Sequence, residues 1–419
     1  MTSIAGESWF QDPALKRVMA LINHDGGEGR VVGGAVRNSL MGLPVGDIDI
    51  ATTLLPQMVV DRAKTEGIKA VPTGIDHGTV TLVVDGKPFE ITTLRRDVET
   101  HGRKATVAFG TDWQEDAERR DLTINALYAD ADGEVIDLVG GLGDVETKTV
   151  RFIGNAAERI AEDYLRILRF FRFFAHYGSG RPDADGLRAS AQARGKLSTL
   201  SAERVWSELK KILSARDPGR ALLWMRQAGV LTAVLPESEK WGIDAIHGLI
   251  AAEQALGWPI DPMLRLAAVI PPDEGRIDAL AGRLRLSNAE AGILRDWARS
   301  PAVSEATVDA AFDRMLYRHG AGGLSMRLKH AVASSRARQA EGDAEAMVRT
   351  GRLTALLKRA LDWKKPQFPL GGADIIAAGI ASGPRVGELL EQLEQQWVDV
   401  NFSLDRASLL ARLDQLKDG

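Results

Sequence analysis

The chain has 419 residues, no cysteine and a formal net charge of −4 at pH 7. Its length predicts about three or four structural modules. The lack of cysteine excludes disulfides, thiolate zinc sites and cysteine nucleophiles, and it favours a cytoplasmic location. No apolar run is long enough to span a membrane, so we expect no membrane partner, and the N-terminus shows no signal-peptide pattern. The charge does not indicate a nucleic-acid binder, but it allows one with local basic patches.

Residues 31–53, VVGGAVRNSLMGLPVGDIDIATT, combine an apolar run, a glycine pair, a short helical stretch and an Asp-Ile-Asp motif. Because side chains alternate along a strand, we expect Asp47 and Asp49 to project to one side. Two adjacent carboxylates repel each other unless a cation lies between them. Oxygen ligands suit Mg²⁺, which usually takes substrate phosphates as further ligands. The motif therefore predicts a metal-bound polyphosphate site, whereas a lone Asp-x-Asp pair is more often a solvated surface feature.

The glycine pair before this motif favours anion binding. Gly33 and Gly34 allow the backbone to approach an anion at a helix start, and Arg37 follows three residues later. A lone glycine pair is usually a turn. The segment is not a Walker P-loop, because its lysine and spacing are absent, and it is not a G-x-G-x-x-G sequence.

Residues 78–84 and 87–93 predict two strands of a hairpin joined by an Asp-Gly turn. Glu90 lies between two apolar neighbours in the second strand, so alternation points its side chain away from the core side that those neighbours share. Next to the Asp-Ile-Asp strand, this carboxylate can complete the metal site or accept a proton from an attacking hydroxyl. Alone, it would be read as a surface residue.

A second polar cluster, RRDLTIN, covers residues 119–125. Its two arginines suit phosphate, and Asp121 and Asn125 can hydrogen-bond ribose hydroxyls. The alternative is a helix start with Asp121 as the N-cap and the arginines on the surface.

The third cluster, residues 162–172, has charged residues at every third position. Asp163, Arg166, Arg169 and Arg172 are therefore expected to form one stripe of a helix, opposite a buried apolar face. Asp163 and Arg166 offer an acceptor and donors that can read the edge of a base. The alternative is a solvated amphipathic helix with an Asp–Arg pair.

Strand signals are confined to the N-terminal part of the chain. Residues 11–150 mix short strands with helices, including a second predicted hairpin around Asp132-Gly133, whereas helical patterning follows to the end. The sequence thus predicts an α/β head and a long all-α portion.

The ordered motifs resemble one known family. They are GGAVRN with DIDIATT, HGTVTLVV with FEITTLRRD, RRDLTINALY, DLVGGLGDVETKTVRFIG, EDYLRILRFFRF and SAERVWSELKKIL. The chain is similar to class II tRNA nucleotidyltransferases, the CCA-adding enzymes, within the superfamily that also holds bacterial poly(A) polymerases. The similarity is dense from Val31 to about Leu213 and diffuse beyond.

The resemblance implies an α+β fold: a nucleotidyltransferase head with a small mixed or antiparallel sheet, then an all-α neck, body and tail. These parts correspond to residues 1–150, 151–215, 216–300 and 301–419. It implies template-independent addition of CCA to tRNA from CTP and ATP, with two Mg²⁺ ions and no obligatory protein partner. The remaining alternatives are a poly(A) polymerase, a CC-adding or A-adding enzyme, and a non-catalytic RNA-binding protein.

The resemblance also implies a role for each matched position. Asp47 and Asp49 would hold the metal ions, and Glu90 would align or deprotonate the tRNA 3′-hydroxyl. The triphosphate and ribose would be contacted by Gly33, Gly34, Arg37, Arg120, Asp121 and Asn125. Asp163 and Arg166 would read the base, supported by Arg169 and Arg172, with Glu203 and Arg204 bracing the helix.

Three further regions carry expectations from the resemblance. Residues 97–118 match a mobile loop used in switching from CTP to ATP, and the loop residues are Arg96, Asp97 and Arg103. Basic residues of the C-terminal third, such as Arg327, Arg352 and Arg359, are candidates for contacts with tRNA. Asn38 departs from the family, which usually has Asp at this position.

Overall fold

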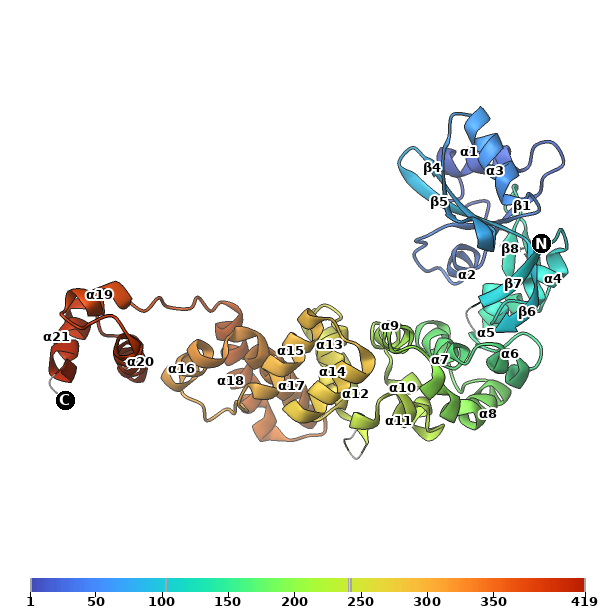
Figure 1. The fold of residues 1–419 in the computed structure, drawn as a ribbon. Helices are drawn as coiled ribbons and strands as arrows, with labels where there is room; N and C mark the ends of the chain where they lie inside the picture. Colours follow the sequence, from blue (N-terminus) through green and yellow to red (C-terminus); the bar gives the residue numbers. More distant parts are fainter. Residues whose placement is uncertain (1, 102–103, 240, 242, 418–419) are drawn as a thin grey trace. The chain divides into compact units, whose positions relative to one another are not determined.

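The computed structural model describes residues 2–101, 104–239, 241 and 243–417. The chain divides into two compact units, Met1–Pro236 and Glu237–Gly419. All strands assigned within the described residues belong to the first unit, and the second unit is built from helices (Figure 1). This arrangement confirms the predicted α+β class, with a small mixed sheet followed by helices. The proposed four-part division into head, neck, body and tail stays a prediction.

A seven-stranded sheet forms the centre of the N-terminal part, with the order β3-β4-β5-β2-β1-β8-β9 among the described residues. The pair β2–β5 is parallel and the other neighbours are antiparallel. A separate hairpin contains β6 and β7. The strands are β1 Gly29–Val32, β2 Asp49–Thr52, β3 Lys69–Gly74, β4 Thr79–Val84, β5 Lys87–Thr93, β6 Arg95–His101, β7 Lys104–Phe109, β8 Leu127–Ala129 and β9 Val135–Asp137.

Both predicted hairpins of the main sheet are confirmed. β4 and β5 are joined by Asp85 and Gly86, whose φ angles of 52° and 78° are those of a tight two-residue turn that suits the twist of the strands. β8 and β9 pair around Gly133, which also has a positive φ of 85°.

The two faces of the sheet have different coverings. The helices α1 (Pro13–Ile22) and α3 (Pro56–Thr65) pack against one face, and α1 begins with Asp12 capping the helix before Pro13. The other face carries a core cluster that includes Ala51 and Ala117. Because Asp49 is two residues from Ala51 in β2, its side chain lies on this second face.

The remaining helical segments of the first unit follow the sheet strands or connect them. They are α2 Gly34–Leu40, η1 Ile75–His77, α4 Trp113–Glu118, η2 Thr123–Asn125, α5 Gly141–Thr147, α6 Ala156–Glu162, α7 Leu165–Tyr177, α8 Ala184–Ala193, η3 Arg194–Thr199, α9 Ala202–Leu213, α10 Gly219–Gln227 and α11 Val230–Val234, with η4 Pro236–Ser238 at the boundary.

The apolar face of α7 is buried as its periodicity predicts, with Phe170 and Phe171 fully buried. One detail of the predicted stripe is wrong. α7 begins at Leu165, and Asp163 has the extended angles φ −153° and ψ 109° at the end of α6. Its side chain accepts a hydrogen bond from the Leu165 N–H at 3.0 Å where α7 begins, and its extended backbone excludes it from the helical stripe.

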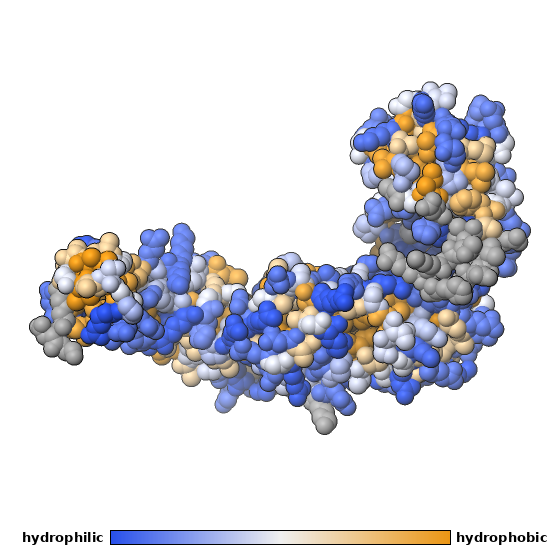
Figure 2. Space-filling view, in the orientation of Figure 1, coloured by the Kyte–Doolittle hydropathy of each residue, from blue (hydrophilic) through white to orange (hydrophobic). Residues whose placement is uncertain are grey.

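Among the described residues of the second unit, one apolar core lies around Phe312, Leu328 and Leu356, and another lies around Leu389 and Trp397. Its visible surface is mostly hydrophilic (Figure 2). Among the described residues, the helices are too short or too polar to cross a bilayer. Their bounds are α12 Ala245–Leu256, α13 Pro262–Val269, α14 Glu274–Leu284, α15 Asn288–Arg299, α16 Asp309–His319, α17 Ala321–Ala340, α18 Ala344–Leu361, α19 Gly372–Ala377, α20 Pro384–Asp399 and α21 Arg406–Lys417.

The start of α5 fits closely against η2, the short helix that carries Asn125. The Asp137 side chain accepts hydrogen bonds from four backbone N–H groups, those of residues 139–142. A Cβ atom on Gly141 would lie 2.4 Å from the Thr123 carbonyl oxygen, whereas one on Gly143 would meet no atom within 4 Å. Only glycine therefore fits at position 141 without displacing η2.

We expect Gly141→Ala to lower the free energy of unfolding by about 2 kcal/mol, because a backbone oxygen cannot yield as a flexible side chain can. The matched control Gly143→Ala lies in the same helix and should raise it by about 0.5 kcal/mol. Urea unfolding of both variants measures the difference. Equal effects of the two substitutions would contradict the close fit of α5 on η2.

Candidate functional site

The predicted third carboxylate lies beside the Asp-Ile-Asp motif. In the parallel pair β2–β5, Asp49 is the register partner of Glu90, so the two side chains share one face of the sheet. Asp47 lies before β2, which begins at Asp49. Only Asp49 therefore belongs to the paired strand, and the expectation that both side chains project to one side stays a prediction.

Close contacts with the described residues do not compensate the negative charges of the Asp47, Asp49 and Glu90 carboxylates. Within the described part of the chain, no hydrogen bond or ion pair holds the side chains of Asp47, Asp49 or Glu90. The pKa of Asp49 is raised by partial desolvation of its carboxyl, then by the negative charges of Glu90 and Asp47, while the positive charge of Arg120 opposes the increase. A cation at this position would relieve the repulsion.

The described residues contain no cluster of three or more His, Cys, Asp or Glu side chains arranged to hold a metal ion. The two aspartates still suit a hard cation, because Mg²⁺ commonly takes one or two protein carboxylates and completes its shell with water and phosphate oxygens.

A polar cavity of about 550 Å³ opens at Asp49. Its walls come from β1, α2, η2, α7 and α9, and seven arginines outnumber three aspartates among its lining side chains. These residues are Val32, Gly33, Gly34, Arg37, Asp49, Arg119, Arg120, Asp121, Asn125, Asp163, Leu165, Arg166, Arg169, Arg172, Phe173, Tyr177 and Arg204. The structure thus brings all ten predicted nucleotide-binding residues and one of the two predicted metal ligands to a single cavity.

The glycine pair shapes the entry to α2. Gly33 has φ 74°, which favours glycine, and a Cβ there would lie 3.4 Å from the Asn125 carbonyl oxygen. The Gly33 N–H donates to the Leu127 carbonyl at 2.9 Å. This N–H group therefore anchors the turn to β8 and is not available to bind an anion.

Arg37 is buried at 5% exposure and is held by three neutral groups. It donates to Asn125 Oδ1 at 2.5 Å, to the Tyr177 hydroxyl at 2.7 Å and to Asn38 Oδ1. Its guanidinium also lies 3.9 Å from the centre of the Tyr177 ring. Burial lowers the pKa of Arg37, and the Tyr177 hydroxyl opposes that effect.

Arg119 and Arg120 share one buried carboxylate, Asp116, which is 1% exposed. Arg119 Nε donates to one oxygen at 2.8 Å, while Arg120 Nη2 and the Tyr128 hydroxyl donate to the other at 3.0 and 2.8 Å. Burial by itself would raise the pKa of Asp116, but Arg120 and Arg119 outweigh burial and lower it. The alternative in which Asp121 is a helix N-cap is not met, because η2 begins only at Thr123.

Asp121 connects η2 with α7. Its Oδ2 accepts from Arg169 at 2.6 Å, and its Oδ1 accepts from Asn125 Nδ2 at 3.2 Å. Burial opposes ionisation of Asp121, but Arg169 dominates and lowers its pKa. Because Asn125 also binds Arg37, a continuous hydrogen-bonded chain runs from Tyr177 to Arg169.

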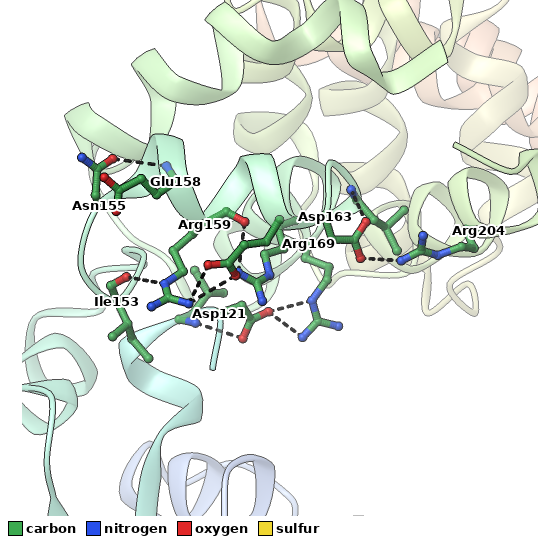
Figure 3. A network of polar contacts seen from close by, with 12 residues as sticks. Asp121, Ile153, Asn155, Glu158, Arg159, Asp163, Arg169 and Arg204 are labelled. Carbon is green, nitrogen blue, oxygen red and sulfur yellow. Dashed lines mark hydrogen bonds and ion pairs between the residues drawn. The ribbon is translucent and has the colours of Figure 1, made fainter. Parts of the chain in front are cut away.

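The two predicted base-reading residues are held by separate partners, and Figure 3 shows the contact of Asp163 with Arg204. Asp163 accepts from Arg204 at 2.5 Å, which agrees with the bracing role expected for that arginine. Arg166 Nη1 donates to Glu162 and, at 3.0 Å, to the Arg159 carbonyl. Arg159 itself donates to Glu162 at 3.0 Å and to the Ile153 carbonyl at 3.2 Å. Asp163 and Arg166 therefore line the cavity without pairing with each other.

Arg172 is fixed at the far end of the stripe. Its Nε donates to the buried Glu208 at 2.6 Å, and its guanidinium lies 4.2 Å from the centre of the Phe173 ring. Two residues of α9 thus hold the two ends of the segment 163–172, because Arg204 binds Asp163 and Glu208 binds Arg172.

The basic residues of the C-terminal third are mostly engaged within their own unit. Arg327 donates to the carbonyls of residues 297, 298 and 300 at the end of α15, and Arg352 and Arg359 pair with Asp309 and Asp313. These contacts give the three arginines structural roles, because they satisfy carbonyls and carboxylates of neighbouring helices.

The structure describes no side chain of the predicted mobile-loop residues Arg96, Asp97 and Arg103. Arg103 lies outside the described residues. The backbones of Arg96 and Asp97 belong to β6, and their assignment to a switching loop stays a prediction.

Three important site residues were not predicted. Asp116 could have been found from its i, i+3 and i, i+4 spacing to Arg119 and Arg120. Tyr177 continues the α7 face four residues after Phe173. Glu208 has no comparable local signal, because its partner Arg172 is 36 residues away in the sequence.

Two protein-family models match the chain. Residues 29–151 match the Poly A polymerase head domain. Residues 183–241 match a family described as "Probable RNA and SrmB- binding site of polymerase A".

Whole-chain relatives are also found. The mitochondrial CCA tRNA nucleotidyltransferase 1 of Mus musculus is 34% identical over 403 residues, covering 95% of this chain and 89% of that protein. The CCA-adding enzyme of Limosilactobacillus fermentum is 30% identical and covers 97% of both chains. The crystal structure of the Bacillus stearothermophilus CCA-adding enzyme in complex with CTP has a TM-score of 0.71 and 26% identity, covering 97% of this chain and 98% of that one.

We expect Asp116→Asn to lower the free energy of unfolding by about 3 kcal/mol at pH 7, because two clustered arginines lose their shared buried carboxylate. The folded-state pKa of Asp116 is lowered, so its stabilisation is present above the ordinary value of 3.8 and is lost as pH falls through the lower folded value. Denaturant unfolding at pH 7 and below pH 4 measures this change. Glu115→Gln, an exposed carboxylate of the same helix, is the matched control; equal losses in both variants would contradict the assignment.

Proposed function

The chain belongs to the family of CCA tRNA nucleotidyltransferases, and we propose that it completes tRNA by adding CCA to the 3′ end from CTP and ATP. Two relatives of this family cover almost the whole chain at 30% identity or more. The substrates are thus tRNA, CTP and ATP, and the reaction releases pyrophosphate.

The observation that carries the catalytic assignment is the register of Asp49 with Glu90 at the mouth of an arginine-lined cavity. Three carboxylate side chains act at this position. Asp47 and Asp49 hold two Mg²⁺ ions, and Glu90 orients the tRNA 3′-hydroxyl or accepts its proton. The bound ions supply Lewis-acid activation of the hydroxyl and neutralise charge on the phosphate oxygens.

The triphosphate lies against the α2 side of the cavity in this proposal. Gly33 and Gly34 leave room for it, and Arg37 and Arg120 place positive charge beside it. Asp121 and Asn125 are already joined to Arg169 and Arg37, so they hold these arginines in place and present oxygen and nitrogen atoms to the ribose.

Asp163 and Arg166 read the base. Cytosine and adenine both present an amino group next to a ring nitrogen acceptor, which match a carboxylate and a guanidinium. Guanine and uracil present a carbonyl oxygen where the amino group would lie, and Asp163 repels it. Arg204 keeps Asp163 oriented, while Arg169 and Arg172 support the nucleotide from α7.

The reaction forms a bond between the tRNA 3′-oxygen and the α-phosphorus as the bond to the pyrophosphate oxygen breaks. The hydroxyl proton passes to Glu90 or to solvent, and the arginines stabilise charge that accumulates on the leaving pyrophosphate. The chain's residues position and neutralise the reactants, so no covalent enzyme intermediate is needed.

We also propose that the tail segment around Gly383, Pro384 and Gly387 contacts the tRNA backbone, and that residues 97–118 assist the change from CTP to ATP. We also propose a cytoplasmic location. The relatives named above include a mitochondrial protein and a bacterial one.

Three tRNA substrates distinguish the candidate activities: one lacking CCA, one ending in CC and one mature. With CTP and ATP together, we expect the first to gain CCA, the second to gain A and the third to remain unchanged, as resolved on a sequencing gel. Arrest after CC would indicate a CC-adding enzyme, and action on the second substrate alone an A-adding enzyme. Long A tails on unrelated RNA would indicate a poly(A) polymerase.

We expect Asp47→Ala to reduce nucleotide incorporation by at least about a thousandfold, because a metal-binding carboxylate is lost. Binding of tRNA, measured by filter retention, should change by less than about threefold, since RNA affinity depends mainly on phosphate contacts elsewhere. Asp132→Ala removes an exposed carboxylate from a turn and serves as control. Normal incorporation by Asp47→Ala would contradict the metal assignment.

A further inference from the structure

The guanidinium of Arg166 is held through one of its three nitrogens. Within the described part of the chain, both of its hydrogen bonds use Nη1, which donates to a carboxylate oxygen of Glu162 and, at 3.0 Å, to the Arg159 carbonyl. The Arg166 side chain is 14% exposed and lines the cavity. Its Nε and Nη2 atoms are therefore left to donate to a ligand, as long as the guanidinium keeps this orientation.

Arg159 holds the carboxylate on which Arg166 depends. Its Nη1 donates to Glu162 Oε1 at 3.0 Å and to Oε2 at 3.2 Å, so both oxygens of this carboxylate are engaged. Without Arg159, the Glu162 carboxylate would be free to turn and to take two nitrogens of Arg166, because a two-pronged contact is the favoured geometry of this pair. Arg159 therefore keeps Glu162 from occupying the remaining donors of Arg166.

Arg159 also connects this pair to the segment that binds Arg169. Its Nε donates to the Ile153 carbonyl at 3.2 Å (Figure 3), and the Ile153 N–H donates to the Asp121 carbonyl at 3.1 Å. The Asp121 side chain in turn accepts from Arg169 at 2.6 Å. Arg166 and Arg169 of α7 are thus both tied to Asp121, the second directly and the first through Arg159.

We propose that Arg159 is a positioning residue for base selection: it holds Arg166 so that the remaining donors of Arg166 meet the ring-nitrogen acceptor that cytosine and adenine share. Arg159 belongs to α6, does not itself line the cavity and acts through Glu162. The proposal rests on the proposed function, in which Asp163 and Arg166 read the base. It adds that base selection depends on a residue outside the cavity.

Nucleotides that lack one ring nitrogen test this role. In 3-deaza-CTP, a C–H group replaces N3 of cytosine and the amino group is kept; 1-deaza-ATP has the same change at N1 of adenine. The experiment measures kcat/KM for each nucleotide and its parent, with tRNA lacking CCA for CTP and tRNA ending in CC for ATP. The ratio of parent to deaza values is independent of the active fraction of the protein, so a merely structural loss of folded enzyme leaves it unchanged.

We expect wild type to prefer each parent nucleotide by at least about tenfold, because the deaza compound lacks the acceptor of a charge-assisted hydrogen bond. In Arg159→Gln, this preference should fall below about threefold through a lower kcat/KM for the parent, with the KM for tRNA unchanged. Arg188→Gln is the matched control. It removes an exposed arginine of α8 that pairs with Asp185 at the same three-residue spacing, and it should keep the wild-type preference.

A wild-type preference in Arg159→Gln would overturn the proposal, and so would an equal fall in Arg188→Gln. Equal use of parent and deaza nucleotides by wild type would overturn it together with base reading by Arg166. Calorimetric titration with CTP and 3-deaza-CTP gives the same comparison without turnover. A wild-type protein that adds no nucleotide to tRNA, yet binds CTP in preference to 3-deaza-CTP unless Arg159 is replaced, would contradict the proposed function alone.

If circular dichroism shows that Arg159→Gln does not fold, Arg159→Lys supplies a second test. Lysine keeps the charge but has one nitrogen in place of the planar fork, so it cannot hold Glu162 and Ile153 together in the same geometry. We expect the preference for the parent nucleotides to fall at least about twofold below that of wild type. An unchanged preference in this variant would overturn the proposal.

Discussion

The cavity depends on the hydrogen-bonded chain that runs from Tyr177 through Arg37, Asn125 and Asp121 to Arg169. Its members come from α2, η2 and α7, which are distant in sequence. Because buried polar groups lose free energy when a partner is removed, a displacement of one segment disturbs the others. This hydrogen-bonded chain joins the start of α2 and the η2 segment to α7, the helix that carries Arg166 and Arg169.

Charge is distributed unevenly along the cavity. Most of its arginines are held by carboxylates such as Asp116, Asp121 and Glu208, which orient them and reduce their net charge. Among the described residues, the carboxylates of Asp49 and Glu90 have no such contact, and Arg37 has no carboxylate within ion-pair distance. In the proposed function, a metal-bound polyphosphate would complement this arrangement, because its cations would meet the carboxylates and its oxygens would meet the arginine.

Arginine by itself is a poor indicator of function in this chain. Arg327, Arg352 and Arg359 resemble an RNA-binding surface in sequence, yet they cap or pair with neighbouring helices. Arg37 carries no signal beyond its place after the glycine pair, but its burial and neutral partners set it apart. The distinction lies in which acceptors surround each guanidinium, and those acceptors come from other segments of the fold.

The sequence by itself determined the local elements and the residue types of the site. The Asp-Gly turn specified the β4–β5 hairpin, alternation placed Glu90 on a polar face, and apolar periodicity defined the buried side of α7. The ordered motifs were sufficient to indicate the family.

Only the tertiary structure determined which side chains of distant segments contact one another. It placed Asp49 opposite Glu90, moved Asp163 off the helical stripe and into contact with Arg204, and gave Asn38 its contacts with Arg37 and Pro44. The physical reason is that periodicity and turn chemistry act between neighbours in the chain. The partners of a buried charge are instead chosen by packing between segments that lie tens of residues apart.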